Sequence, residues 1–123
     1  MTASPAPVIL LVDNEPLIRA VLAEVLRQSG FDVRTASSGV EAVEMARQTP
    51  PSLVLMDVQM PGLSGWDTLE RLHETMRALP VLLMSGADFH DEALRRGAAG
   101  FISKPYRPVD VVRDVREVLD RAG

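Results

Sequence analysis

The sequence of 123 residues contains no cysteine, which excludes a disulfide framework, a thiolate zinc site and a cysteine nucleophile. It also lacks any apolar run that approaches the ~18 residues of a membrane span. Positive charge is scarce, since 13 lysines and arginines stand against 17 aspartates and glutamates. The net charge of -4 argues against direct binding of nucleic acid. We therefore expect neither a membrane nor a nucleic acid as a direct partner.

No basic segment precedes the first apolar run, so we expect no secretory signal peptide and a cytoplasmic location. Residues 1–7 are rich in small residues and proline, which is typical of a flexible lead-in. The rest of the chain, residues 8–121, suits one domain. Its composition of 46% hydrophobic and 24% charged residues is that of an ordinary globular protein.

Four short apolar runs each stop at a polar residue. Residues 8–12 stop before Asp13, 53–56 before Asp57, 81–84 before Ser85, and 101–103 before Lys104. Continuous apolar runs between helical patterns predict strands that are buried on both faces of a parallel sheet. The carboxyl ends of such strands lie at one edge of the sheet, where open α/β sheets bind ligands. This edge is the candidate site.

Helical patterns separate these runs, and a weaker alternating run at residues 31–36 predicts an edge strand. Five strands alternating with five helices predict right-handed crossovers and a three-layer α/β domain. Ser38 and Glu41 fit a capping box, and Asp88 can cap a short fourth helix. Helical spacing predicts the following inner faces: Leu17, Ile18, Val21, Leu22, Val25 and Leu26; Val40, Val43 and Ala46; Trp66, Leu69, Leu72 and Met76; Val109, Val112, Val115 and Leu119.

With these residues in place, the chain resembles the receiver domain of two-component response regulators, of the chemotaxis-regulator type. The resemblance covers Val8 to Arg121 and is carried by residues 11–16, 56–65, 84–86 and 100–105. It is specific because all four segments occur in order, each at a predicted strand end. It implies a flavodoxin-like, five-stranded parallel sheet of order 2-1-3-4-5 flanked by five helices.

The resemblance also implies roles for single residues. Asp57 would be the phosphoacceptor, which takes a phosphoryl group from a sensor histidine kinase or a histidine phosphotransfer protein. Ser85 would bond one phosphoryl oxygen and Lys104 would pair with another. Phe101 matches an aromatic residue that turns inward with Ser85 on activation, and the bond from Lys104 to Pro105 is usually cis. Such a protein is a signalling switch for a downstream protein or output domain, and catalyses only its own phosphotransfer and dephosphorylation.

The implied cofactor is Mg²⁺, a hard cation that prefers oxygen ligands. Its ligands would be Asp13, Asn14, Asp57 and the backbone carbonyl of Gln59. Asn14 departs from the family, which usually has a second acid there, and the lost charge predicts weaker Mg²⁺ binding. Glu15 is not expected to be a ligand. The alternative function is therefore a pseudo-receiver, a constitutive protein-binding module whose metal site is weakened at Asn14.

A second departure is the interval between Ser85 and Lys104, which is shorter than usual by roughly one helical turn. The loss falls on the fourth helix, which argues against the dimer that many family members form through that face.

Each site residue also has a plain structural interpretation: Asp57 and Asp13 as caps, Ser85 as a turn residue, Lys104 as a solvated charge, Phe101 as core. The sequence does not match the haloacid-dehalogenase phosphatases well, because they need an aspartate at the position that Glu15 occupies in the first turn. It does not match the flavodoxins well either.

Overall fold

The computed structural model describes residues 5–122, so residues 1–4 of the expected lead-in and Gly123 lie outside the described residues. Five strands alternate with five helices, as the sequence predicts. In chain order they are β1 (Val8–Val12), α1 (Pro16–Gln28), β2 (Asp32–Ala36), α2 (Gly39–Gln48), β3 (Leu53–Asp57), α3 (Gly65–Thr75), β4 (Val81–Ser85), α4 (His90–Arg95), β5 (Gly100–Ser103) and α5 (Pro108–Ala122).

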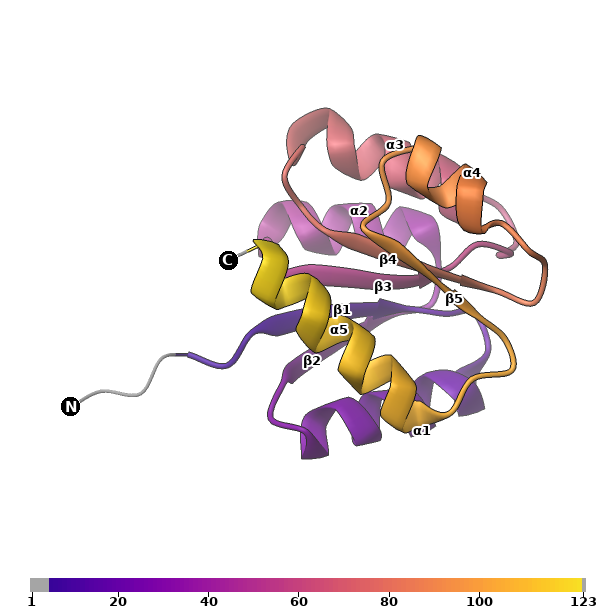
Figure 1. Cartoon of the computed structure of the whole chain (residues 1–123). Coiled ribbons are helices and arrows are strands. Elements are labelled where there is room, and N and C mark those ends of the chain that lie inside the picture. The colour runs from indigo at the N-terminus through magenta and orange to yellow at the C-terminus, as the bar shows by residue number, and fades with distance from the viewer. Residues whose placement is uncertain (1–4, 123) are drawn as a thin grey trace.

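All strand pairs are parallel and the order is β2-β1-β3-β4-β5, which confirms the predicted topology (Figure 1). The strands β3 and β4 lie inside the sheet and every one of their residues is buried. β5 behaves differently, because it lies at an edge and only Ile102 is buried. The expectation that all four apolar runs are buried on both faces is therefore wrong for β5.

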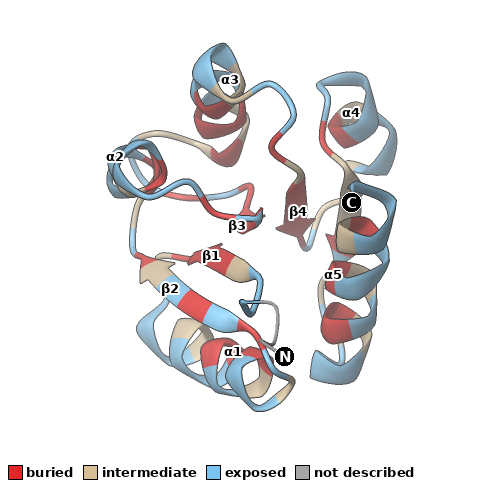
Figure 2. Cartoon of the chain, turned by 90° about the vertical axis from the view of Figure 1, so that its left-hand side faces the viewer, coloured by how far each residue is buried: buried red, intermediate tan, exposed pale blue. Residues whose placement is uncertain are grey.

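Two layers of helices cover the sheet. Helices α1 and α5 pack on one face, while α2, α3 and α4 pack on the other (Figure 1). Side chains alternate between the two faces, so that Leu55 belongs to the α1/α5 core and Met56 to the α2/α3 core. Figure 2 shows buried residues along the strands and the inner helix faces, and exposed ones on the outer helix faces. No helix within residues 5–122 combines the length and apolar character that a membrane crossing requires.

The predicted inner faces are buried in part, and several helices leave one or two of their apolar residues outside. Leu17 and Val21 of α1 are 76% and 51% exposed, while the predicted Leu22 and Leu26 are buried together with Ala23. Val40 and Val109 are also exposed, and α5 buries the predicted Val112 and Val115 together with Val111 and Val118. The reason is that each helix carries more apolar residues than one sheet-facing stripe can hold.

The helix ends follow local side-chain chemistry. Ser38 caps α2 by accepting a hydrogen bond from the backbone N–H of Glu41 at 3.2 Å. The Glu41 carboxylate accepts a hydrogen bond from the backbone N–H of Ser37 rather than from that of Ser38. Only half of the expected capping box therefore forms. The fourth helix is short, as predicted, with six residues. Phe89 occupies the N-cap position, and the predicted Asp88, one residue earlier, accepts a hydrogen bond from the N–H of His90 at 3.4 Å.

Candidate functional site

Strand register brings the four predicted polar residues to one edge of the sheet. Val12 pairs with Met56, so the next residues, Asp13 and Asp57, lie side by side at the ends of β1 and β3. Asp57 in turn pairs with Met84, the residue before Ser85. Ser85 pairs with Ser103, and Lys104 follows directly. The parallel sheet therefore assembles the site from residues that are up to 91 positions apart (104 minus 13).

Asp57 is held by donors on both of its carboxylate oxygens. The Lys104 ammonium lies 2.5 Å from Oδ2, and the backbone N–H of Gln59 donates to Oδ1 at 3.0 Å. The Asp57 side chain is 6% exposed and that of Lys104 is 23% exposed. Burial acts to lower the pKa of Lys104, but the hydrogen bond and charge of Asp57 outweigh it and raise that pKa. The lysine therefore stays cationic beside a carboxylate of fixed orientation.

Asp13 is fully buried, and its two oxygens differ. Oδ1 accepts a hydrogen bond from the backbone N–H of Glu15 at 2.9 Å. Oδ2 is buried and has no hydrogen-bond partner among the described residues. Burial raises the pKa of Asp13, and the neighbouring charge of Asp57 raises it further, against the opposing influence of that hydrogen bond and of Lys104. A buried carboxylate oxygen without a donor fits a cation.

The donors around that oxygen suit Mg²⁺. Asp13 and Asp57 supply carboxylates on adjacent strands, and Asn14, which is half-buried, follows Asp13 directly. Within residues 5–122 there is no cluster of three His, Cys, Asp or Glu side chains that could hold a metal. The sequence predicts the amide oxygen of Asn14 and the backbone carbonyl of Gln59 as further ligands, and both are oxygens of the kind that Mg²⁺ prefers. These residues fit a hard cation that keeps some of its waters.

Arg19 is a site neighbour that sequence reasoning missed. Its guanidinium Nη1 donates to the backbone carbonyl of Asp13 at 2.7 Å, which ties α1 to the turn after β1. The only signal in the sequence is a basic residue one turn into the helix that follows an acidic turn. Because the bond goes to the backbone, the Asp13 carboxylate remains free to bind a cation.

Ser85 is fully buried at the end of β4. Its Oγ accepts a hydrogen bond from the backbone N–H of Ala87 at 3.0 Å, which leaves the hydroxyl proton available to another acceptor. The backbone carbonyl of Ser85 accepts from the N–H of Lys104 at 2.9 Å. The Lys104–Pro105 peptide bond is cis, as the resemblance implies.

Phe101, the predicted switch residue, is only partly buried. Its ring lies edge-on to that of His90, with 6.4 Å between the centroids. Phe101 packs against the α2/α3 core and, with His90, lines part of a cavity of about 280 Å³. His73, in the last turn of α3, is fixed by a 2.9 Å hydrogen bond between Nε2 and the carbonyl of Leu79.

A family model, described as the response regulator receiver domain, matches residues 9–116. The transcriptional activator protein ExaE of Pseudomonas putida is 43% identical over 119 residues, which cover 90% of this chain and 54% of that protein. A probable transcriptional regulatory protein, TcrX of Mycobacterium tuberculosis, is 34% identical over 118 residues, which cover 94% of this chain and 50% of that protein. The chain thus spans about half the length of these curated relatives.

Solved structures show the same architecture. The receiver domain of NtrX from Brucella abortus superposes with a TM-score of 0.85 at 30% sequence identity, over 91% of this chain and 98% of that chain. A receiver domain protein from Clostridium thermocellum superposes with a TM-score of 0.87 at 26% identity, over 94% of this chain and 95% of that chain.

Proposed function

This chain belongs to the response regulator receiver domain family of two-component systems, and we propose that it is a phosphorylation-dependent switch with Asp57 as its phosphoacceptor. The observation that carries the proposal is the buried Asp57 carboxylate, oriented by Lys104 and Gln59 beside the unpartnered oxygen of Asp13. An aspartate that only capped a loop would need neither the lysine nor a second buried acid.

In the proposed reaction an Asp57 oxygen attacks the phosphorus of a phosphohistidine or of a small donor such as acetyl phosphate. An O–P bond forms while the P–N or P–O bond of the donor breaks, and the leaving group keeps the electron pair. Lys104 moves from the carboxylate oxygen to a phosphoryl oxygen, where its charge offsets the developing negative charge. Mg²⁺ bound by Asp13, Asn14, Asp57 and the Gln59 carbonyl would neutralise further charge on the transferred group.

The switch follows from the same contacts. Ser85 has a hydroxyl proton that can turn to a phosphoryl oxygen, and Phe101 would then move out of its place beside the cavity of about 280 Å³ that it lines. The chain catalyses only its own phosphotransfer and dephosphorylation, so its product is a signal. We propose residues 8–121 as the receiver domain. The longer relatives are named as transcriptional regulators, so the signal passes to an output domain or partner protein rather than to nucleic acid bound by this acidic domain.

A protein phosphodonor is supported by exposed apolar surface beside the acidic edge. A groove of about 260 Å³ is lined by Leu17, Ile18, Val21, Leu22, Tyr106 and Pro108. Tyr106 lies two residues after Lys104, which places this surface next to the acceptor. A histidine kinase or phosphotransfer protein that docks there covers Leu17 and Val21. Leu17→Ser is expected to slow transfer from a phosphorylated phosphotransfer protein while leaving labelling by phosphoramidate unchanged; equal loss with both donors would contradict this docking site.

The decisive experiment is intact mass after incubation with phosphoramidate or acetyl phosphate, with and without Mg²⁺, beside Asp57→Asn. One added phosphoryl group that requires both Mg²⁺ and Asp57 supports the switch. If a folded protein gains no phosphoryl group from either donor at high Mg²⁺, the alternative applies, and the chain is a pseudo-receiver that binds its partner constitutively.

Asn14 sets the strength of the metal site in this proposal. Replacing the family's acid by an amide removes one negative charge, so the wild type is expected to bind Mg²⁺ more weakly than Asn14→Asp. The Mg²⁺ affinity is measured from the rise in thermal stability with Mg²⁺ concentration, which needs no phosphodonor. Equal affinities of the two proteins would show that Asn14 does not weaken the site.

A further inference from the structure

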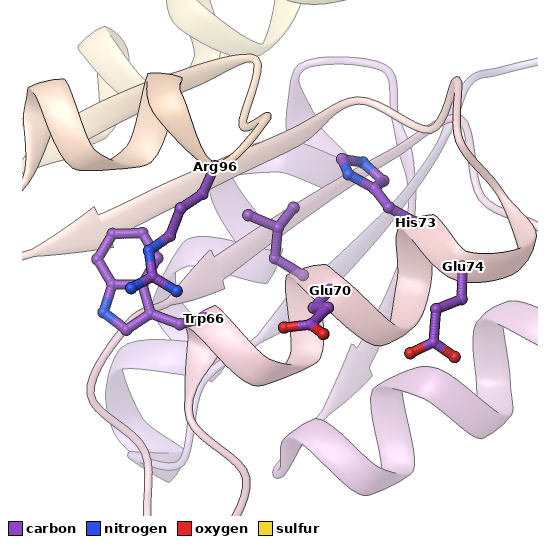
Figure 3. A pocket seen from close by; sticks show the side chains of 6 residues that line it. Trp66, Glu70, His73, Glu74 and Arg96 are labelled. Atoms are coloured by element: carbon purple, nitrogen blue, oxygen red, sulfur yellow. The ribbon is translucent and has the colours of Figure 1, made fainter.

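The indole of Trp66, at the start of α3, contacts both ends of α4. The ring of Phe89, the N-cap of α4, lies edge-on to the indole with 5.4 Å between centroids and 79° between planes. The guanidinium of Arg96, the C-cap, lies over the indole, 4.9 Å from its centroid (Figure 3). Both arrangements are attractive, since the ring edge of one aromatic or a cation meets the electron-rich face of another. One side chain therefore fixes both ends of this helix.

Apart from Trp66, α4 is held mainly by its packing on β5, where the His90 ring lies edge-on to that of Phe101. It has six residues, too few to be stable without tertiary contacts, and Ala93 is its only buried residue. Leu94 is 48% exposed. A groove of about 330 Å³ separates α3 from the C-terminal end of α4, with Trp66 and Arg96 at one end and His73 and Glu74 further along α3 (Figure 3). The contacts of Trp66 with the two caps therefore add to the packing on β5 and hold the ends of a short, mostly exposed helix.

The backbone that carries Trp66 is packed against the acceptor aspartate. A Cβ atom on Gly65 would lie 2.6 Å from the carbonyl oxygen of Asp57, so these two backbone segments touch. The N–H of Gly65 also donates to the carbonyl of Val58 at 2.8 Å. Trp66 is the next residue, so the indole links the phosphoacceptor strand to α4.

The other connection to α4 runs through Ser85. Its Oγ accepts from the N–H of Ala87 and so fixes the turn that leads to Phe89. If Ser85 turns toward a phosphoryl group, this turn loses its acceptor and Phe89 is free to leave the indole. The two links to α4 thus converge on Trp66, one from Asp57 and one from Ser85.

We propose that Trp66 is a positioning residue that clamps both ends of α4 in the resting state, and that phosphorylation of Asp57 releases α4 from the indole. The proposal rests on the proposed function, because it needs a phosphoryl group on Asp57. It assigns to Trp66 the stabilisation of the resting position of α4. Weakening the contacts of Trp66 with α4 destabilises only the resting state. The activated state, which binds the phosphoryl group or its mimic, is therefore favoured.

The test uses Trp66 itself, since it is the only tryptophan and the emission reports on it alone. Emission is recorded with and without Mg²⁺ and beryllofluoride, a phosphoryl mimic, in the wild type, Asp57→Asn, Arg96→Ala and Arg95→Ala. Arg95 is the matched control, because both arginines pair with Glu92 and only Arg96 lies over the indole. Hydrogen exchange of the α4 amides is measured on the same samples, and the adduct on Asp57 is followed by intact mass with phosphoramidate.

Beryllofluoride is expected to shift the wild-type emission to the red and to speed exchange in α4, and Asp57→Asn is expected to show neither change. Arg96→Ala is expected to exchange faster in α4 without any ligand and to bind beryllofluoride about threefold more tightly, while Arg95→Ala matches the wild type. Equal exchange in Arg96→Ala and Arg95→Ala would overturn the clamp. A phosphorylated wild type with unchanged emission and exchange would overturn the release and leave the proposed function standing. Absence of any adduct would overturn the proposed function and the release together, while the exchange comparison still decides the clamp.

Discussion

The acidic edge of the sheet and the segment around α4 are neighbours built in opposite ways. Asp13, Asp57 and Ser85 end strands of the sheet and are themselves buried, with backbone hydrogen bonds to each side chain. The α4 segment follows one of these strands directly, yet buries a single helical residue. Chemistry on a phosphoryl group requires side chains held in fixed positions. A signal requires an element that moves at small cost, and the contrast shows how one short domain provides both.

The largest difference is expected in core substitutions. Leu55→Ala removes a fully buried side chain from β3 and is expected to lower the free energy of unfolding by about 2–5 kcal/mol. Leu94→Ala on α4, where the side chain is 48% exposed, is expected to change it by less than about 0.5 kcal/mol. Urea unfolding followed by circular dichroism measures both values. Similar losses for the two variants would remove the contrast between the regions.

Two glycines next to the site sharpen the comparison. Gly65→Ala places a Cβ atom 2.6 Å from backbone atoms of Asp57 and Val58, so we expect a loss of about 1–3 kcal/mol and slower phosphorylation. Gly86→Ala, in the turn toward α4, meets no atom within 4 Å and is expected to be neutral or stabilising by up to about 1 kcal/mol. Urea unfolding and the labelling rate with phosphoramidate test the pair. A tolerated Gly65→Ala would mean that the backbone around Asp57 yields easily.

Asp13→Asn tests the electrostatic side of the contrast. Burial raises the pKa of Asp13 above its ordinary value near 3.8, so the folded state binds a proton more readily than the unfolded chain. The ionised Asp13 therefore destabilises the fold above its raised pKa, and this penalty is lost as the pH falls through that pKa. Without Mg²⁺ at neutral pH, Asp13→Asn is expected to stabilise the protein by about 1 kcal/mol, since a neutral amide avoids the desolvation of a buried charge.

The same variant is expected to lose the stabilisation by Mg²⁺ that the wild type shows, because it lacks one carboxylate of the site. Thermal unfolding at several pH values, with and without Mg²⁺, measures both effects. A destabilised Asp13→Asn in the absence of metal would indicate that the ionised carboxylate has a stabilising partner in the fold.

The smallest expected effect concerns α5, which packs beside α1 on the opposite face of the sheet from α4. Arg116 donates to the backbone carbonyl of Ser29 at 2.9 Å and lies 5.8 Å from the ring centroid of Phe31, so it joins α5 to the end of α1. Arg116→Ala is expected to cost about 0.5–1 kcal/mol in urea unfolding. Arg113→Ala, which loses only exposed ion pairs with Asp110 and Asp114, serves as its control and is expected to cost less.

The elements and the edge that they build could be predicted from the sequence, because both depend on local patterns. Apolar runs that stop at Asp13, Asp57 and Ser85 specify buried parallel strands, and such strands align their carboxyl ends without further information. The short fourth helix follows from the interval between Ser85 and Lys104. The roles of Asp57, Lys104 and the metal ligands required the resemblance to a family, and they remain predictions for the experiments above.

Only the tertiary structure decided which stripe of each helix faces the sheet and which side chains meet across elements. Periodicity in α1 allows several apolar stripes, and the folded chain buries Ala23 while Leu17 and Val21 stay exposed. The unpartnered oxygen of Asp13 and the clamp of Trp66 on α4 were likewise invisible, because each depends on groups brought together from separate parts of the chain. Local sequence determines the period of an element, whereas its rotation and its neighbours are set by the packing of the whole core.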